Sequence, residues 1–367
     1  MDSVLELVAG SYEQILFGYK VQKGEKEWTL KAEFTHHAHT ASLCAVAANE
    51  RYIATGSKDE TIQLYDMKNK KEHGVLLHHN GTISCLEFYG ASHLLSGAED
   101  GLLCVWSTRK WECLKSIKAH RGQVSFVSVH PSGKLALSVG TDRTLRTWNL
   151  IDGRSAFIKN IKQSAHIVMW SPAGDKYVVV VNNKIDIYKL ETATVIGTFS
   201  CPMRISSITF LSNSVLAVAG DDEVVRLFDT DSQKCVCEFV AHENRVKSLD
   251  SCTVGDLCVL VSASNDGFIK LWNVSLEKVT EPPALLGMVN TTARLTCLSV
   301  WQPGPQGECS AEQDVQAVTS QASTTATEPK RRKKEIFTEE VIVEDPSCTK
   351  RVKTQGGEKK KKRKTNK

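Results

Sequence analysis

The chain has 367 residues, of which 41% are hydrophobic, and its 46 Lys and Arg residues slightly outnumber its 42 Asp and Glu residues. This length allows one large repeat domain and an appendage. No apolar run approaches the roughly 18 residues of a membrane-spanning helix, and no charged-then-apolar leader is present, so we expect neither a membrane anchor nor a secretory signal. The 12 cysteines are scattered without a Cys-x-x-Cys pair, which favours reduced intracellular thiols.

The predicted elements are short strands along most of the chain. In chain order, residues 8–19 and 28–34 come first. Nearly the same segment then recurs as GSKDETIQLY from Gly56, GAEDGLLCVW from Gly97, GTDRTLRTW from Gly140, GDDEVVRLF from Gly220 and ASNDGFIKLW from Ala263. Alternating runs such as LLCVW predict strands with one buried face, and the Gly, Asp and Asn residues between them predict turns. No copy contains a convincing helical pattern, so the sequence predicts an all-β fold.

The repeats have a regular period. Their aligned aromatic residues are 41, 42, 40, 40 and 44 positions apart, at Tyr65, Trp106, Trp148, Tyr188, Phe228 and Trp272. Six positions before these aromatic residues stand, in the same order, Asp59, Asp100, Asp142, Asn182, Asp222 and Asp266. A period of ~40–45 residues with four strands per copy is typical of one blade of a β-propeller.

The two ends of this region complete a seventh blade. Residues 8–19 follow the same template, with Glu13 at the acid position and Tyr19 at the aromatic position, but this copy lacks an innermost strand. Residues 293–301 (ARLTCLSVW) have the pattern of that strand and no partner strands after them. Pairing the two ends removes the exposed edges of an open array. We therefore predict that residues 1–301 form a seven-bladed β-propeller closed by N- and C-terminal strands.

The repeats resemble those of WD-repeat β-propellers, in which a loop His, a strand Ser or Thr, a turn Asp and a strand Trp form a hydrogen-bonded tetrad. The resemblance implies structural tetrads in blades one, two, three and six: His39, Thr55, Asp59 and Tyr65; His79, Ser96, Asp100 and Trp106; His120, Ser138, Asp142 and Trp148; His242, Ser262, Asp266 and Trp272. The fourth and fifth copies lack the His, and the closing copy has Glu13 without an aligned His or Ser. We expect these three blades to depend more on apolar packing.

Repeated Ser, His and Asp residues also raise the possibility of a hydrolase triad. Four near-identical sets around a ring would be four active sites, and the needs of each blade already explain each set. The sequence has no Gly-x-Ser-x-Gly elbow, no phosphate-binding loop and no His-Glu-x-x-His motif. His36, His37 and His39 have a spacing that could touch a metal, but no acid or Cys completes the set. We predict a protein that is not an enzyme, with no metal site and no cofactor.

The composition changes abruptly after Trp301. Residues 302–329 are predicted to form a low-complexity linker and residues 330–367 a disordered basic tail. Residues 302–367 carry 15 Lys and Arg against 10 Asp and Glu. Two clusters predict nuclear targeting or non-specific, salt-sensitive contact with RNA, and they comprise Lys330, Arg331, Arg332, Lys333, Lys334, Lys359, Lys360, Lys361, Lys362, Arg363 and Lys364. The alternative is a solvated tail without a partner.

Arginines precede the innermost strands of three consecutive blades. The residue before this strand is neutral and polar in blades one to four, and it is Arg204, Arg245 and Arg294 in blades five, six and seven. Ring geometry predicts an arc of guanidinium groups on one face. The residues before each turn acid form a second set on that face, which includes Lys58. Because Arg favours planar contacts with carboxylates and phosphates, we expect an acidic protein segment or an RNA backbone as the ligand. The alternative is pairing with loop acids such as Asp221.

Longer stretches indicate one family among the WD-repeat propellers. ELVAGSYEQILFGYKV, FTHHAHTASL, KWECLKSIKAHRGQV, HPSGKLALSVGTDRTLRTWNL, GRSAFIKNIK and AHENRVKSL together closely resemble the p21-activated kinase-interacting family. The resemblance implies a scaffold in the nucleus and nucleolus for large ribosomal subunit assembly and rRNA processing, whose partners are assembly factors and pre-large-subunit particles. It also implies an alternative, a negative regulator in signalling that binds p21-activated kinase and restrains its activation. A ubiquitin-ligase receptor would need a Trp-Asp-x-Arg motif, which residues 65–68 match poorly.

Overall fold

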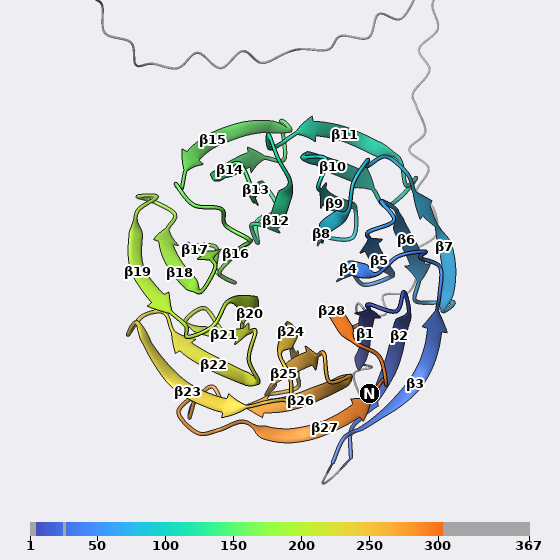
Figure 1. Ribbon diagram of the computed structural model, residues 1–367, viewed down its shortest axis with the longest axis vertical. Coiled ribbons are helices and arrows are strands. Elements are labelled where there is room, and N and C mark those ends of the chain that lie inside the picture. Colours follow the sequence, from blue (N-terminus) through green and yellow to red (C-terminus); the bar gives the residue numbers. More distant parts are fainter. Residues whose placement is uncertain (1–4, 25–26, 304–367) are drawn as a thin grey trace, which may run out of the picture. The chain divides into compact units, whose positions relative to one another are not determined.

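The computed structural model describes residues 5–24 and 27–303. Within these ranges every regular element is a β-strand, and the strands form seven antiparallel sheets of four strands arranged in a ring (Figure 1). The predicted all-β, seven-bladed β-propeller is therefore confirmed. Among the described elements, no helix has the length and apolar character that crossing a membrane requires. The predicted linker and basic tail begin at residue 302 and lie almost entirely outside the described residues.

Six blades are formed by consecutive strands, and each begins with its innermost strand. Blade one contains β4 (Leu43–Ala48), β5 (Tyr52–Ser57), β6 (Ile62–Asp66) and β7 (Lys71–Leu76), and blade two contains β8 (Ile83–Tyr89), β9 (His93–Ala98), β10 (Leu102–Ser107) and β11 (Cys113–Lys118). Blade three contains β12 (Val124–Val129), β13 (Leu135–Gly140), β14 (Thr144–Asn149) and β15 (Arg154–Asn160), and blade four contains β16 (Ile167–Trp170), β17 (Lys176–Val181), β18 (Lys184–Lys189) and β19 (Val195–Ser200). Blade five contains β20 (Ile205–Phe210), β21 (Val215–Gly220), β22 (Val224–Asp229) and β23 (Lys234–Val240), and blade six contains β24 (Val246–Val254), β25 (Leu257–Ser264), β26 (Phe268–Val274) and β27 (Ala284–Asn290).

The seventh blade joins the two ends of the propeller region. Its strand order is β28 (Leu295–Trp301), β1 (Leu5–Ser11), β2 (Leu16–Gln22) and β3 (Thr29–His36). β28 pairs antiparallel with β1, so that Val8 lies opposite Ser299 and Ala9 opposite Leu298. The ring is therefore closed by main-chain hydrogen bonds between residues almost 300 positions apart, as the unmatched strand at residues 293–301 predicted.

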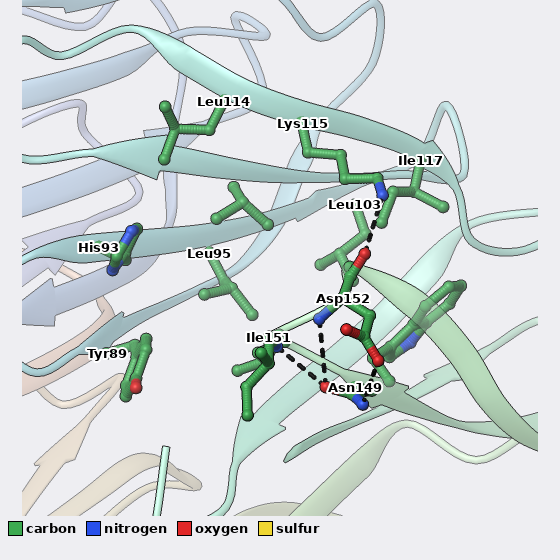
Figure 2. A pocket seen from close by; sticks show the side chains of 14 residues that line it. Tyr89, His93, Leu95, Leu103, Leu114, Lys115, Ile117, Asn149, Ile151 and Asp152 are labelled. Atoms are coloured by element: carbon green, nitrogen blue, oxygen red, sulfur yellow. Dashed lines mark hydrogen bonds between the residues drawn. The ribbon is translucent and has the colours of Figure 1, made fainter. Parts of the chain in front are cut away.

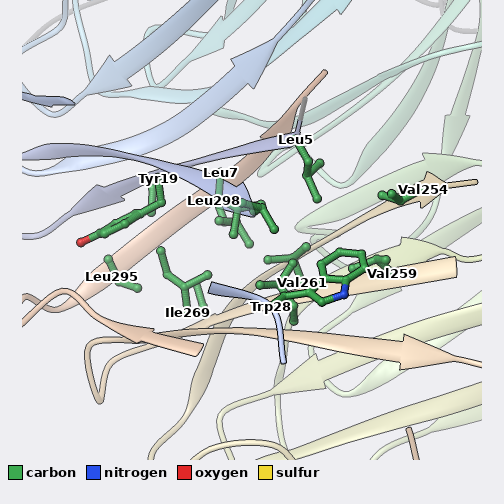
Figure 3. Packing of buried hydrophobic residues seen from close by; sticks show 14 residues of the cluster. Leu5, Leu7, Tyr19, Trp28, Val254, Val259, Val261, Ile269, Leu295 and Leu298 are labelled. Atoms are coloured by element: carbon green, nitrogen blue, oxygen red, sulfur yellow. The ribbon is translucent and has the colours of Figure 1, made fainter. Parts of the chain in front are cut away.

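The hydrophobic core lies between neighbouring blades. All six residues of β21, a second strand, are buried, whereas five of the six residues of the outermost strand β7 are exposed. This difference is consistent with the mostly apolar sequence LALSVG of the second strand β13 and the more polar sequence KEHGVL of the outer strand β7. At the boundary of blades six and seven, Leu7 and Tyr19 belong to the same buried cluster as Val261 and Ile269 (Figure 3).

Two glycines on second strands show how closely the blades approach one another. A Cβ atom on Gly56 would lie 2.4 Å from Cγ2 of Ile83 in the next blade, and one on Gly97 would lie 2.7 Å from Cγ1 of Val124. Cβ atoms in proteins essentially never approach another heavy atom more closely than 3.0 Å. These positions therefore require glycine because any side chain would push the next innermost strand away.

Side chains also connect the innermost strands of neighbouring blades. Glu87 Oε1 accepts the backbone N–H of Val129 at 2.9 Å, and Asp250 Oδ2 accepts that of Val300 at 2.7 Å. Burial raises the pKa of Glu87 to about 8 and that of Asp250 to about 6, although the backbone hydrogen bonds oppose the shift. These carboxyl groups satisfy edge N–H groups that would otherwise lack a partner.

Candidate partner-binding face

The antiparallel course of each blade places two kinds of loop on one face of the ring, which we call the top face. These are the turns between the second and third strands and the connections that lead into the innermost strands. The predicted partner-binding residues and the His and Asp residues of the predicted tetrads belong to these loops, whereas the hydroxyl and aromatic members of the tetrads lie in the second and third strands. The turns between the third and fourth strands lie on the opposite face.

The structure brings the members of the four predicted tetrads together. The His Nδ1 atoms lie 2.9 to 3.0 Å from the turn carboxylates, in the pairs His39–Asp59, His79–Asp100, His120–Asp142 and His242–Asp266. The His Nε2 atoms lie 2.7 to 2.8 Å from the strand hydroxyls of Thr55, Ser96, Ser138 and Ser262. The indole N–H groups of Trp106, Trp148 and Trp272 donate to the same serines, and Tyr65 takes the aromatic position in blade one.

The hydrogen bonds of blade three fix the proton positions in its tetrad. Burial disfavours the charge on Asp142, but hydrogen bonds from Thr144, His120 and the backbone of Arg121 outweigh it and lower the pKa to about 2. The ionised carboxylate can only accept, so His120 donates from Nδ1 and accepts the Ser138 hydroxyl at Nε2. Burial also lowers the pKa of His120, against the opposing effect of Asp142, so the imidazole stays neutral. Every polar atom is thereby used in the structure of the blade.

Blade five replaces the missing tetrad with an ion pair. Cys201, which is buried, stands three residues before Arg204, where blade three has His120 three residues before Gln123. Asp222 instead accepts a hydrogen bond from Arg226 Nη2 at 2.7 Å, and the Arg226 side chain is only 7% exposed. The expectation that this blade would depend more on apolar packing overlooked this pair.

Backbone hydrogen bonds place the two predicted sets of top-face residues side by side. In six blades the residue before the turn acid donates its N–H to the carbonyl of the residue before the innermost strand. The pairs are Lys58 with Ser42, Glu99 with Thr82, Thr141 with Gln123, Asp221 with Arg204, Asn265 with Arg245 and Tyr12 with Arg294, at 2.8 to 3.3 Å. In blade four, Asn182 takes the acid position itself, and its N–H lies 3.3 Å from His166 Nδ1.

The three arginines are exposed and lie on consecutive blades. Within the described residues, the Arg204 side chain makes no hydrogen bond or ion pair. The Asn265 side chain satisfies its hydrogen bonds when its amide oxygen faces Arg245. In this orientation the amide oxygen accepts hydrogen bonds from Arg245 Nε at 2.6 Å and Nη2 at 2.9 Å. Asp221, which could have neutralised Arg204, instead lies 3.4 Å from Lys247 Nζ. Two of the three guanidinium groups are therefore not neutralised by a described carboxylate.

Arg294 has a second environment, which the sequence did not predict. Its Nε atom lies 2.9 Å from Oε1 of Glu13, and its guanidinium lies 4.2 Å from the ring centroid of Tyr12. Hydrogen bonds and charge from Arg294 lower the pKa of Glu13 although partial burial opposes this. Lys58 Nζ lies 5.8 Å from the same ring, and Tyr12 is 50% exposed. An exposed aromatic ring between two cations thus extends the arginine arc across the closing blade to blade one.

The other candidate sites do not coincide with this arc. His39 belongs to its tetrad, His37 Nε2 lies 3.4 Å from Gln14 Oε1, and His36 Nδ1 lies 3.8 Å from Glu72 Oε1, so the three histidines of THHAH have separate contacts. A cavity of about 220 Å³ lies between blades two and three, and Figure 2 shows Tyr89, Leu114 and Ile151 around it. Its Lys115 ammonium is 3.5 Å from the carbonyl of Asp152. The two predicted nuclear-targeting clusters lie outside the described residues.

Fold and tetrads together define a WD-repeat β-propeller, and comparison with known families agrees. The model of the WD domain, G-beta repeat, matches residues 28–66, 70–107, 111–149 and 233–273. The chain is 66% identical over 361 residues to the p21-activated protein kinase-interacting protein 1-like of Danio rerio, covering 98% of this chain and 97% of the relative. It is 57% identical to p21-activated protein kinase-interacting protein 1 of Homo sapiens, over 81% of this chain and 77% of the relative. It is 28% identical to Shk1 kinase-binding protein 15 of Schizosaccharomyces pombe, over 89% of this chain and 94% of the relative. The chain therefore belongs to the p21-activated kinase-interacting protein family.

Proposed function

We propose that this protein is a non-enzymatic scaffold whose top face binds an acidic segment of a protein partner. Arg204, Arg245 and Arg294 supply the guanidinium groups, and Lys58 supplies a further positive charge. The observation that carries the proposal is the placement of three exposed arginines on consecutive blades, two of them without a described carboxylate partner. Guanidinium groups bind carboxylates through paired hydrogen bonds, so a row of them selects an acidic strand or loop.

We further propose that the scaffold acts in the nucleus and nucleolus, in large ribosomal subunit assembly and rRNA processing. Two features of the sequence support this role. The basic clusters at residues 330–334 and 359–364 are suited to nuclear import and to salt-sensitive phosphate contacts. The family resemblance implies the same role. In this proposal the tail concentrates the protein near RNA without base-specific recognition, while the propeller binds assembly factors and pre-large-subunit particles.

The second candidate function is binding of p21-activated kinase with restraint of its activation. The names of relatives favour it, since the relatives from Danio rerio and Homo sapiens are called p21-activated protein kinase-interacting and that from Schizosaccharomyces pombe is called Shk1 kinase-binding. The arginines of the top face would also suit this partner, provided that the kinase binds through an acidic segment.

Affinity purification from cells distinguishes these functions. Tagged full-length protein is recovered with and without nuclease, beside a triple variant with Arg204→Glu, Arg245→Glu and Arg294→Glu. The matched control carries Arg109→Glu, Lys134→Glu and Arg154→Glu, three exposed cations at the opposite ends of the strands.

The proposal predicts that large-subunit assembly factors survive nuclease with the wild type and the control, and are lost with the triple top-face variant. Recovery of p21-activated kinase as the main partner, with ribosomal material lost to nuclease, would favour the second candidate. Equal recovery of all partners by the wild type and the triple variant would contradict the use of the arginine face.

A further inference from the structure

Two thiols and an imidazole meet at the outer part of the boundary between blades one and two. His78 lies in the connection from β7 to β8, Cys104 lies in β10, and Cys113 is the first residue of β11. One ligand atom from each residue lies within 4.8 Å of those of the other two. Cys104 is fully buried, Cys113 is partly buried and His78 is exposed. The cluster is therefore anchored in the core and open to solvent on one side.

A bulge between the third and fourth strands, which recurs in every blade, brings the two cysteines of blade two together. In the regular part of the β10–β11 pair, Cys104 lies opposite Ser116, but a bulge between Val105 and Trp106 then pairs Trp106 with Cys113. Both cysteines are free, and their sulfur atoms lie within 4.8 Å of one another. Cys104 Sγ is 3.5 Å from Ser116 Oγ, and Cys113 Sγ is 3.4 Å from the carbonyl oxygen of Lys115.

Ring contacts orient the His78 imidazole without using its nitrogen atoms. The ring lies edge-to-face against Trp106, with centroids 5.9 Å apart, and against His79 at 6.3 Å. Within the described part of the chain, neither ring nitrogen of His78 makes a hydrogen bond. Imidazole nitrogen and thiolate sulfur are the donors that zinc prefers in proteins.

We propose that His78, Cys104 and Cys113 form a zinc-binding site with three protein ligands and a fourth position open to water. Zinc–ligand bonds of about 2.0 to 2.3 Å in a tetrahedron place neighbouring ligand atoms about 3.3 to 3.8 Å apart. From the observed separation, the ligand atoms would move inward by on the order of 1 Å. Binding of the divalent ion breaks the two S–H bonds and releases both protons to solvent, so each sulfur binds as a thiolate.

The site would fasten the loop between blades one and two to the outer strands of blade two. The same loop carries His79, which belongs to the tetrad of blade two. Burial raises the pKa of the Cys104 thiol to about 12, so the metal must displace a firmly held proton. The spacing of these residues along the chain does not match the short Cys-x₂₋₄-Cys pairs of common zinc motifs, which explains why the sequence predicted no metal here.

The test is a metal titration of the reduced full-length protein after treatment with a chelator. Cobalt(II) is the spectroscopic probe, because thiolate ligation gives a charge-transfer band in the near ultraviolet, and zinc(II) is then added to displace it. The variants are Cys113→Ser and His78→Asn, whose side chains are at least partly exposed, with Cys235→Ser as the matched control at another exposed cysteine. Circular dichroism shows whether each variant is folded.

We expect one equivalent of cobalt with a thiolate band that zinc abolishes. Affinity should fall more than about tenfold in Cys113→Ser and in His78→Asn and stay unchanged in Cys235→Ser, because loss of a ligand costs at least as much as loss of its supporting contacts. Absence of the band, or a band that Cys113→Ser leaves intact, would overturn the proposal. A disulfide between Cys104 and Cys113 in protein isolated from cells would overturn it as well.

Discussion

Ser138 joins the hydrogen bonds of the blade-three tetrad, and its hydroxyl is completely buried. It donates to His120 Nε2 and accepts from Trp148 Nε1, both at 2.8 Å. The Ser138→Ala variant would leave the imidazole lone pair and the indole N–H without these partners in a buried site. Each unsatisfied buried group costs about 1 to 3 kcal/mol, so for two groups we expect the free energy of unfolding to fall by about 2 to 6 kcal/mol.

Urea unfolding followed by tryptophan fluorescence and circular dichroism measures this change. Ser138→Thr is the matched control, because Thr55 occupies the same position in blade one and its hydroxyl lies 2.8 Å from His39 Nε2. The threonine variant should retain most of the stability. A loss below about 0.5 kcal/mol in the alanine variant, which is typical of a neutral surface change, or an equal loss in both variants, would refute the assigned role of the hydroxyl.

Three other predictions concern stability. The pKa of Glu87 is about 8 in the folded protein against an ordinary 4.5, so the free energy of unfolding should fall as the pH rises from 4.5 to about 8. Because Glu87 is partly exposed, we expect Glu87→Gln to remove about 2 kcal/mol of this pH dependence. Identical pH profiles of unfolding in the wild type and the variant would contradict this prediction. Gly97→Ala should cost about 1 to 3 kcal/mol in urea unfolding through its clash with the next blade, whereas Gly74→Ala, whose Cβ meets nothing within 4 Å, should cost little. Arg226→Met should lower the free energy of unfolding by about 3 kcal/mol, because Asp222 would lose its ion-pair partner. Adding Asp222→Leu should restore part of this stability. No recovery in the double variant would argue against the ion pair.

The closed ring and the tetrads could be predicted because each blade repeats the same local chemistry. An acid six positions before an aromatic residue identifies the turn and the third strand, as Asp142 and Trp148 do in blade three. The missing innermost strand at the N-terminus and the unpartnered strand at residues 293–301 then leave only one way to close the ring. The positions of the three arginines followed from the same alignment, since they precede equivalent strands.

The features that were missed depend on contacts that do not repeat. Glu13 was expected to serve as a turn acid, but the closing pair of strands brings it to Arg294 from the other end of the chain. Arg226 substitutes for a histidine at a different position of the motif, so an alignment on the histidine could not find it. The approach of Cys104 to Cys113 depends on a bulge that every blade has between its third and fourth strands, but the repeat pattern does not require cysteines at both positions beside it.

We propose that the arginine face of blades five, six and seven, with the adjoining Tyr12, binds the partner. Hydrogen–deuterium exchange of the full chain, alone and bound to the main protein partner recovered by affinity purification, tests it most directly. Binding at this face should slow exchange at the top-face loops around Tyr12, Arg204, Arg245 and Arg294 and leave the turns at residues 108–112 and 150–153 unchanged. Slower exchange confined to those opposite turns, with unchanged exchange at the four top-face positions, would contradict it.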